Sequence, residues 1–73
     1  MVWALYDGRT VPMDYIVNPA DRFKRAAQRI ADNGFDGYVV DDQRAVYAVT
    51  RSRKTAKRCD GATSERVLME AGL

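Results

Sequence analysis

The strongest constraint on the fold is a helix signal between Asn18 and Gly34. Asn18 is a residue type that caps helices, and Pro19 suits the first helical position because its missing N–H would be unpaired there anyway. An apolar stripe at spacings of three and four residues follows, formed by Phe23, Ala26, Ala27 and Ile30. Gly34 is the type of residue that adopts the left-handed conformation after a last helical turn. The pattern predicts one amphipathic helix that begins at Asn18 and ends near Asn33.

Two β-type runs precede this helix and are joined by Asp7-Gly8. That dipeptide readily takes the positive φ angles of a two-residue hairpin turn. Residues 2–6 and 11–17 are therefore predicted to form a hairpin. Pro12 lacks an N–H, which restricts it to a strand start, a bulge or a sheet edge.

A second hairpin is predicted after the helix, from the runs 38–40 and 45–49. With Asp42-Gln43 as its turn, Tyr38 and Tyr47 lie opposite one another. Both tyrosines then share one sheet face with Val40, Ala45 and Val49. An exposed pair of this kind stacks nucleic-acid bases on some sheets, whereas a buried pair belongs to the core.

Residues 50–61 show no regular period, and a short final helix is predicted beyond them. Thr63 or Ser64 would cap it, Gly72 would end it, and Val67, Leu68 and Ala71 would face the core. The expected order is β-β-α-β-β-α, an α+β fold with a four-stranded, mostly antiparallel sheet and the first helix packed on one face. The 73 residues are expected to form one domain, in which residues 51–60 make a flexible basic loop.

The single cysteine, Cys59, cannot form an internal disulfide, which favours a reducing compartment. No apolar run approaches the roughly 20 residues needed to cross a bilayer. The first residues lack the features of a secretory signal. We therefore expect a cytoplasmic protein without a membrane partner.

Patterns typical of catalysis or metal binding are missing from the sequence. The chain has no histidine, the commonest general base at neutral pH and the usual partner of a nucleophile. Cys59 lies beside cations, which lower a thiol pKa, but no base or second cysteine accompanies it. Asp41 and Asp42 are of a type that binds Mg²⁺, yet their spacing matches no metal loop and aspartate is common in turns. We expect no enzyme activity, no cofactor and no metal.

Basic residues are concentrated in one short segment. Residues 51–58 hold five positive charges and no acid, while the other 65 residues hold seven basic and ten acidic side chains. The five basic residues are Arg51, Arg53, Lys54, Lys57 and Arg58. Such a segment is either a solvated connector or a contact for an anionic partner.

Two further groups of residues are candidate binding surfaces. Arg22, Arg25 and Arg29 recur at spacings of three and four and form a cationic stripe along the predicted helix. Arginine forks bind carboxylates or phosphates in a bidentate manner, although such a stripe also serves simply to solubilise a helix. Trp3 and Tyr6, in the first hairpin, are of types enriched at protein interfaces and equally common in cores.

These features together predict a non-enzymatic protein that binds another macromolecule. The leading hypothesis is a small inhibitor or adaptor that binds a larger host protein complex through the aromatic hairpin and the arginines. The size, the arginine content and the missing catalytic residues are typical of small accessory proteins of phages and mobile elements, although no motif identifies a family. The alternative is a nucleic-acid-binding protein that uses residues 51–58 and the arginine stripe. A homodimer through the hairpin is a further alternative.

Overall fold

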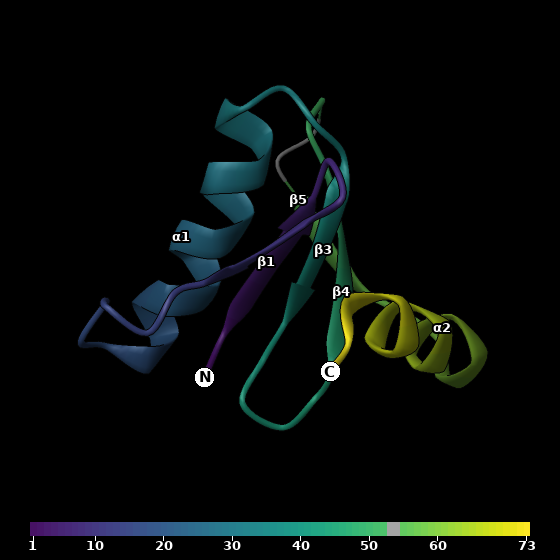
Figure 1. The fold of residues 1–73 in the computed structure, drawn as a ribbon. Helices are drawn as coiled ribbons and strands as arrows, with labels where there is room; N and C mark the ends of the chain where they lie inside the picture. Colours follow the sequence, from purple (N-terminus) through teal and green to yellow (C-terminus); the bar gives the residue numbers. More distant parts are fainter. Residues whose placement is uncertain (53–54) are drawn as a thin grey trace.

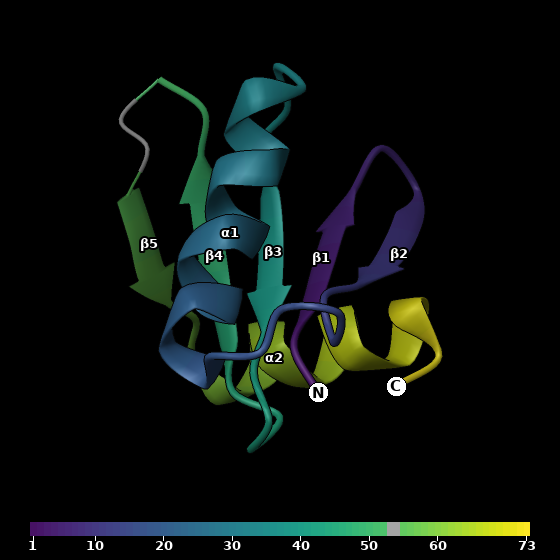
Figure 2. The ribbon, with the colours of Figure 1, turned by 90° about the vertical axis from the view of Figure 1, so that its left-hand side faces the viewer.

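The computed structural model describes residues 1–52 and 55–73 of the chain. It is an α+β fold with a five-stranded antiparallel sheet and one helix on each face (Figure 1). Along the chain the elements are β1 (Trp3–Tyr6), β2 (Arg9–Pro12), α1 (Pro19–Asp32), β3 (Gly37–Val40), β4 (Val46–Thr50), β5 (Thr55–Arg58) and α2 (Gly61–Ala71). The strand order across the sheet is β2-β1-β3-β4-β5, so β2 and β5 form its two edges (Figure 2).

The first hairpin has the predicted turn but a shorter second strand. Asp7 and Gly8 adopt φ angles of 51° and 68° and join β1 directly to β2. β2 ends at Pro12 instead of continuing to residue 17. The amide of Met13 closes the ladder by donating to the Val2 carbonyl (2.8 Å), after which the chain turns towards α1. Pro12 lies on an edge strand, as its missing N–H requires.

Helix α1 begins and ends as the sequence predicts. The Asn18 side chain accepts a hydrogen bond from the Ala20 amide (3.0 Å), and Pro19 is the first helical residue. Gly34 follows the last turn with a φ of 81°. The predicted apolar stripe faces the sheet, with two members buried and two packed at the margin of the core: Ala26, Ile30, Phe23 and Ala27.

One helix covers each face of the sheet (Figures 1 and 2), and each face has its own core. The face that α1 covers buries Ala4, Tyr6, Val39 and Val49 together with Met13. The face that α2 covers buries Leu5, Val40 and Val46 against Val67. The second helix thus covers the face that α1 leaves free.

The register of β3 and β4 differs from the prediction by one residue. The connection is a three-residue loop, in which Arg44 adopts a left-handed φ of 63°, instead of a two-residue turn. The additional residue places Tyr47 opposite Val39 and Tyr38 opposite Ala48. Because successive strand residues point to opposite faces, Tyr47 lies on the α1 face and Tyr38 on the α2 face. The prediction that the two tyrosines share a face was wrong.

Strand β5 lies within the segment that was expected to be a loop. Thr55–Arg58 pairs antiparallel with β4, so the sheet has five strands instead of the predicted four. The described side chains of this strand, at positions 56 to 58, are exposed. An edge strand of that kind needs no alternation of apolar residues, which explains why the sequence did not reveal it. Arg53 and Lys54 of the predicted basic segment lie outside the described residues.

Helix α2 starts earlier than predicted. Its cap is Asp60, whose carboxylate accepts a hydrogen bond from the Thr63 amide (2.7 Å). The expected caps, Thr63 and Ser64, therefore lie inside the helix, while Gly72 ends it with a φ of 73° as predicted. In the described part of the chain, neither α1, with 14 residues, nor α2, with 11, has the length and apolar character that a membrane-crossing helix needs.

Candidate functional site

The open edge at β5 exposes backbone hydrogen-bonding groups. The Cys59 amide donates to the Val46 carbonyl of β4 (2.9 Å). Backbone groups of successive strand residues are directed to alternate sides of the strand. The backbone N–H and C=O groups of Lys57 therefore face β4, as those of Cys59 do. The backbone N–H and C=O groups of Ala56 and Arg58 point away from the sheet.

The opposite edge, at β2, offers fewer donors. The Met13 amide donates to the Val2 carbonyl (2.8 Å). The same alternation therefore directs the backbone groups of Thr10 and Pro12 away from the sheet. Pro12 has no N–H, which leaves Thr10 as the outward-facing donor of this strand. Proline on an edge strand is a common device against unwanted strand pairing. β5 is accordingly the edge that is better able to accept another strand.

A groove lies between β5 and α1. Its volume is about 190 Å³, and the residues that line it are Phe23, Lys24, Ala27, Gln28 and Ala56. Phe23 packs edge to face on Tyr47 of β4, with ring centroids 4.9 Å apart and 85° between the ring planes. This contact fixes an aromatic side chain beside the open strand edge. We call this feature the α1–β5 groove.

The surroundings of the α1–β5 groove are positively charged. Lys24 lines the groove, and Lys57 and Arg58 are exposed on β5, whereas no acidic side chain contributes to the lining. Within residues 1–52 and 55–73, the salt bridge between the Met1 amino group and Asp42 is the only one. The three cations therefore have no carboxylate partner within that part of the chain.

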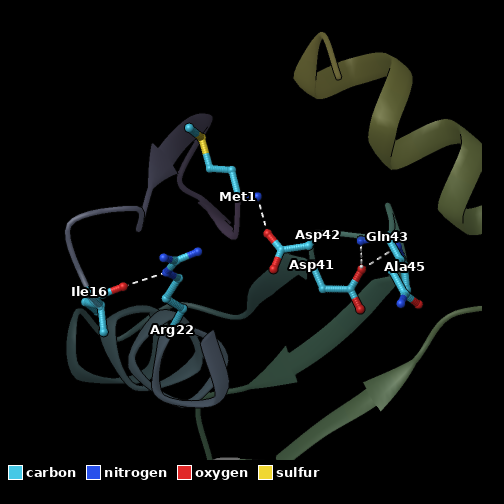
Figure 3. Close-up of polar contacts among 7 residues, drawn as sticks. All are labelled: Met1, Ile16, Arg22, Asp41, Asp42, Gln43 and Ala45. Carbon is cyan, nitrogen blue, oxygen red and sulfur yellow. Dashed lines mark hydrogen bonds and ion pairs between the residues drawn. The ribbon is translucent and has the colours of Figure 1, made fainter. Parts of the chain in front are cut away.

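The predicted arginine stripe lies on the other flank of α1. The Arg22 guanidinium donates to the Ile16 carbonyl in the loop before α1 (Figure 3). Arg29 donates to the hydroxyls of Tyr6 and Tyr15, both at 3.3 Å, and the bond to Tyr6 is the main reason that its pKa is raised. These partners belong to β1 and to the loop after β2, away from the β5 edge. The stripe and the basic strand thus do not form one surface.

Arg25 and Arg51, which were also predicted as binding residues, lie in different parts of the fold. Arg25 lines a hollow with Tyr15 and Arg29, on the same flank as the rest of the stripe. The Arg51 guanidinium donates to the Gly34 carbonyl (2.8 Å). Arg51 therefore links the end of β4 to the end of α1 and has a structural partner of its own.

The aromatic residues of the first hairpin contribute to the two cores. Trp3 is half-buried in the cluster formed with α2, and Tyr6 is 6% exposed on the α1 face. Neither ring forms the exposed aromatic surface that the sequence suggested. The physical reason is that β1, which carries both rings, packs against α1 on one face and against α2 on the other.

The aspartates and the cysteine have structural surroundings. The Asp41 carboxylate accepts hydrogen bonds from the amides of Gln43 and Ala45 (both 2.9 Å), and Asp42 accepts one from the N-terminal amino group (Figure 3). Burial raises the pKa of the Cys59 thiol, which keeps it protonated and weakly nucleophilic at neutral pH. Among the residues that the structure describes, no group of three His, Cys, Asp or Glu side chains is placed to hold a metal ion.

The sequence predicted Lys57 and Arg58 as candidate binding residues but did not single out the other residues at this edge. Ala56 contributes a backbone amide, which no side-chain pattern marks. Lys24 and Gln28 were not singled out, because the flank of α1 that faces β5 is known only once β5 is recognised as a strand.

The fold and the site define a small α+β protein with an open, basic sheet edge beside a helix. Comparisons with protein-family models, with curated proteins and with solved structures gave no match. The function is therefore inferred from the geometry of the chain itself.

Proposed function

We propose that this protein binds an extended segment of another protein, which adds to the sheet as a further strand beside β5. The observation that carries the proposal is the pair of outward-facing backbone positions, Ala56 and Arg58, next to the α1–β5 groove. No covalent chemistry is part of this function.

Strand addition depends on two kinds of contact. Main-chain hydrogen bonds to an edge strand supply affinity, and pockets for alternate side chains of the added strand supply specificity. The outward-facing groups of Ala56 and Arg58 meet the first requirement. The second is met because Phe23 and Ala27 provide an apolar wall directly beside Ala56.

This mode of binding suits a small inhibitor or adaptor. An extended segment that is added to β5 is held in a fixed conformation and is removed from its other contacts. A larger protein complex that presents such a segment is blocked or redirected without any catalytic step. The protein partner is thus the occupant that the sheet edge favours.

Nucleic-acid binding is the weaker candidate. Phosphate contacts place a nucleic-acid backbone along a path of cations. Here the cations of β5 and the arginine stripe lie on different flanks of α1, and Arg22 and Arg29 already bind carbonyl or hydroxyl groups of the chain. Phosphates on β5 would accept hydrogen bonds from the outward-facing amides, but they would leave the outward-facing carbonyls and the apolar wall of the groove without partners.

A pair of proline substitutions, one at each sheet edge, tests the proposal. A random-peptide display library is first selected against the unmodified protein to obtain a binding peptide. Ala56→Pro then removes an outward-facing amide of β5 without removing a donor to β4. Thr10→Pro is the matched control, because it removes the outward-facing amide of β2. Circular dichroism and thermal unfolding establish that both variants are folded.

We expect Ala56→Pro to weaken binding of the selected peptide by about tenfold or more, since a hydrogen bond is lost and the ring blocks close approach. Thr10→Pro should leave the affinity unchanged. Equal effects of the two substitutions, or no effect of Ala56→Pro, would contradict strand addition at β5. Salt-sensitive binding of DNA or RNA that Ala56→Pro leaves unaltered would favour the nucleic-acid alternative.

A further inference from the structure

We infer that the segment accepted by β5 is acidic, with an aliphatic residue opposite Ala56 and carboxylates opposite Lys57 and Arg58. This inference rests on the proposed function and deepens it by naming the chemistry of the partner. It follows from the direction of pairing, the face on which each position lies and the charges at the edge.

The added strand runs antiparallel to β5. All strand pairs of this sheet are antiparallel, and antiparallel pairing is slightly more stable per residue than parallel pairing. In this arrangement the partner residues opposite Ala56 and Arg58 form the hydrogen-bonded pairs. Read from its N-terminal end, the partner meets Arg58 first, then Lys57, then Ala56.

The partner residue opposite Ala56 faces the α1–β5 groove. Ala56 pairs with Val49, which belongs to the core under α1. Residues directly opposite on neighbouring strands share a face, so the partner side chain meets Phe23 and Ala27. The groove measures about 190 Å³, and an apolar cavity of roughly 150 Å³ holds a molecule of the size of benzene. An aliphatic side chain such as that of valine therefore fits.

The next two partner positions meet positive charge. Arg58 pairs with Tyr47 and lies on the α1 face, while Lys57 pairs with Ala48 and lies on the α2 face. Opposite charges directly across two strands stabilise the pair, and like charges destabilise it. Because neither cation has a salt-bridge partner in the described part of the chain, carboxylates of the partner meet no internal competitor there.

The same charges disfavour a second copy of this chain as the occupant. A twofold pairing of β5 with its copy that used both outward-facing positions would be centred on Lys57. That lysine would then lie opposite its own copy, which is a destabilising arrangement. Lysine on an edge strand is a device by which proteins avoid pairing with themselves. The occupant is therefore a segment of a different protein.

Synthetic peptides with defined central residues test this inference. The probes carry Glu-Glu-Val, Lys-Lys-Val or Glu-Glu-Gly at the centre, with threonine and serine on both sides. Their Kd values are measured by calorimetry at low ionic strength for the unmodified protein and for the double variant Lys57→Glu, Arg58→Glu. Thermal unfolding checks that the double variant is folded, as expected for exposed side chains.

We expect the unmodified protein to prefer Glu-Glu-Val over Lys-Lys-Val by about tenfold, from two charge pairs changed in sign, and the double variant to reverse this preference. Glu-Glu-Gly should bind more weakly than Glu-Glu-Val, because no side chain enters the groove. Equal affinity for the two charge types would overturn the inference. So would a preference that the double variant leaves unaltered, or failure of Glu-Glu-Val to bind while a library-selected peptide of another composition does.

The variant Ala56→Pro distinguishes failure of this inference from failure of the proposed function. If the charge of the peptide has no effect on affinity but Ala56→Pro still weakens binding of the library-selected peptide, strand addition stands and the inference of an acidic partner is wrong. If Ala56→Pro leaves the binding of every peptide unchanged, strand addition itself is wrong. A dimer in sedimentation experiments that Ala56→Pro dissociates would show that the occupant is a second copy, contrary to the inference.

Discussion

Phe23 and Tyr47 pack edge to face across the contact between α1 and β4, with ring centroids 4.9 Å apart. Edge-to-face aromatic pairs add about 0.5–1.5 kcal/mol beyond the area they bury. A double-mutant cycle with Phe23→Leu and Tyr47→Leu, measured by chemical denaturation, should give a coupling energy in that range. Additive effects of the two substitutions would show that the rings are independent and that the groove wall is not fixed as described.

Gly37 lies where β3 passes close to β1 and α1. A Cβ atom at this position would lie 2.2 Å from the Leu5 carbonyl oxygen and 3.1 Å from the Ile30 side chain. Gly37→Ala should therefore lower the free energy of unfolding by about 1–3 kcal/mol, the usual cost of overpacking. The control is Gly61→Ala in α2, where the added Cβ atom would meet no atom of a non-neighbouring residue within 4 Å. That variant should be unchanged or more stable by up to about 1 kcal/mol, and equal losses in both would contradict this packing.

The cap of α2 gives the protein a pH-dependent contribution to stability. The hydrogen bond from the Thr63 amide lowers the pKa of the Asp60 carboxyl. A lowered pKa in the folded state stabilises the fold above about pH 4, the value for an unfolded aspartate, and this stabilisation is lost as the pH falls through the folded value. Asp60→Ala should lower the melting temperature at neutral pH, and the difference from the unmodified protein should shrink in acid. Asp60→Asn, which keeps the cap acceptor, should lower the melting temperature at neutral pH by less than Asp60→Ala does. If the difference between Asp60→Ala and the unmodified protein grew in acid, Asp60 would not be the pH-dependent cap of α2.

The direction of the β5 amides is open to a direct stability test. Lys57→Pro removes an amide that faces β4, so the free energy of unfolding should fall by about 1–3 kcal/mol. Ala56→Pro removes an amide that faces outwards, and its effect should stay below about 1 kcal/mol. Chemical denaturation of the two variants provides the comparison. The opposite ranking would mean that the register of β5 against β4 is shifted by one residue.

Local signals in the sequence predicted the parts of the fold that depend on local interactions. The Asn18 cap, the Gly34 stop and the Asp7-Gly8 turn each act within a few residues, and the structure confirms all of them. The predicted two-residue turn between β3 and β4 was wrong. The reason is that Arg44, a residue type that seldom adopts positive φ, takes the left-handed position usually held by glycine or asparagine. Nothing in the local sequence distinguishes that loop from a two-residue turn.

The candidate site could be predicted only in part, because it depends on pairing between distant residues. The charges of Lys57 and Arg58 are visible in the sequence. The outward direction of the Ala56 amide is not, since it follows from the hydrogen bond between Cys59 and Val46. The sequence predicted Arg22 as a binding residue in the same way, but the fold places the Ile16 carbonyl within its reach.

Hydrogen exchange at the amides of Ala56 and Arg58 tests the central claim most directly. These two amides should exchange faster than that of Lys57 in the free protein, because they point away from β4. In the complex with a library-selected peptide, both should slow by about tenfold or more, as expected for amides that become hydrogen-bonded. The amide of Thr10, at the other edge, should be unaffected. Unchanged exchange at Ala56 and Arg58 in the saturated complex would contradict strand addition at β5.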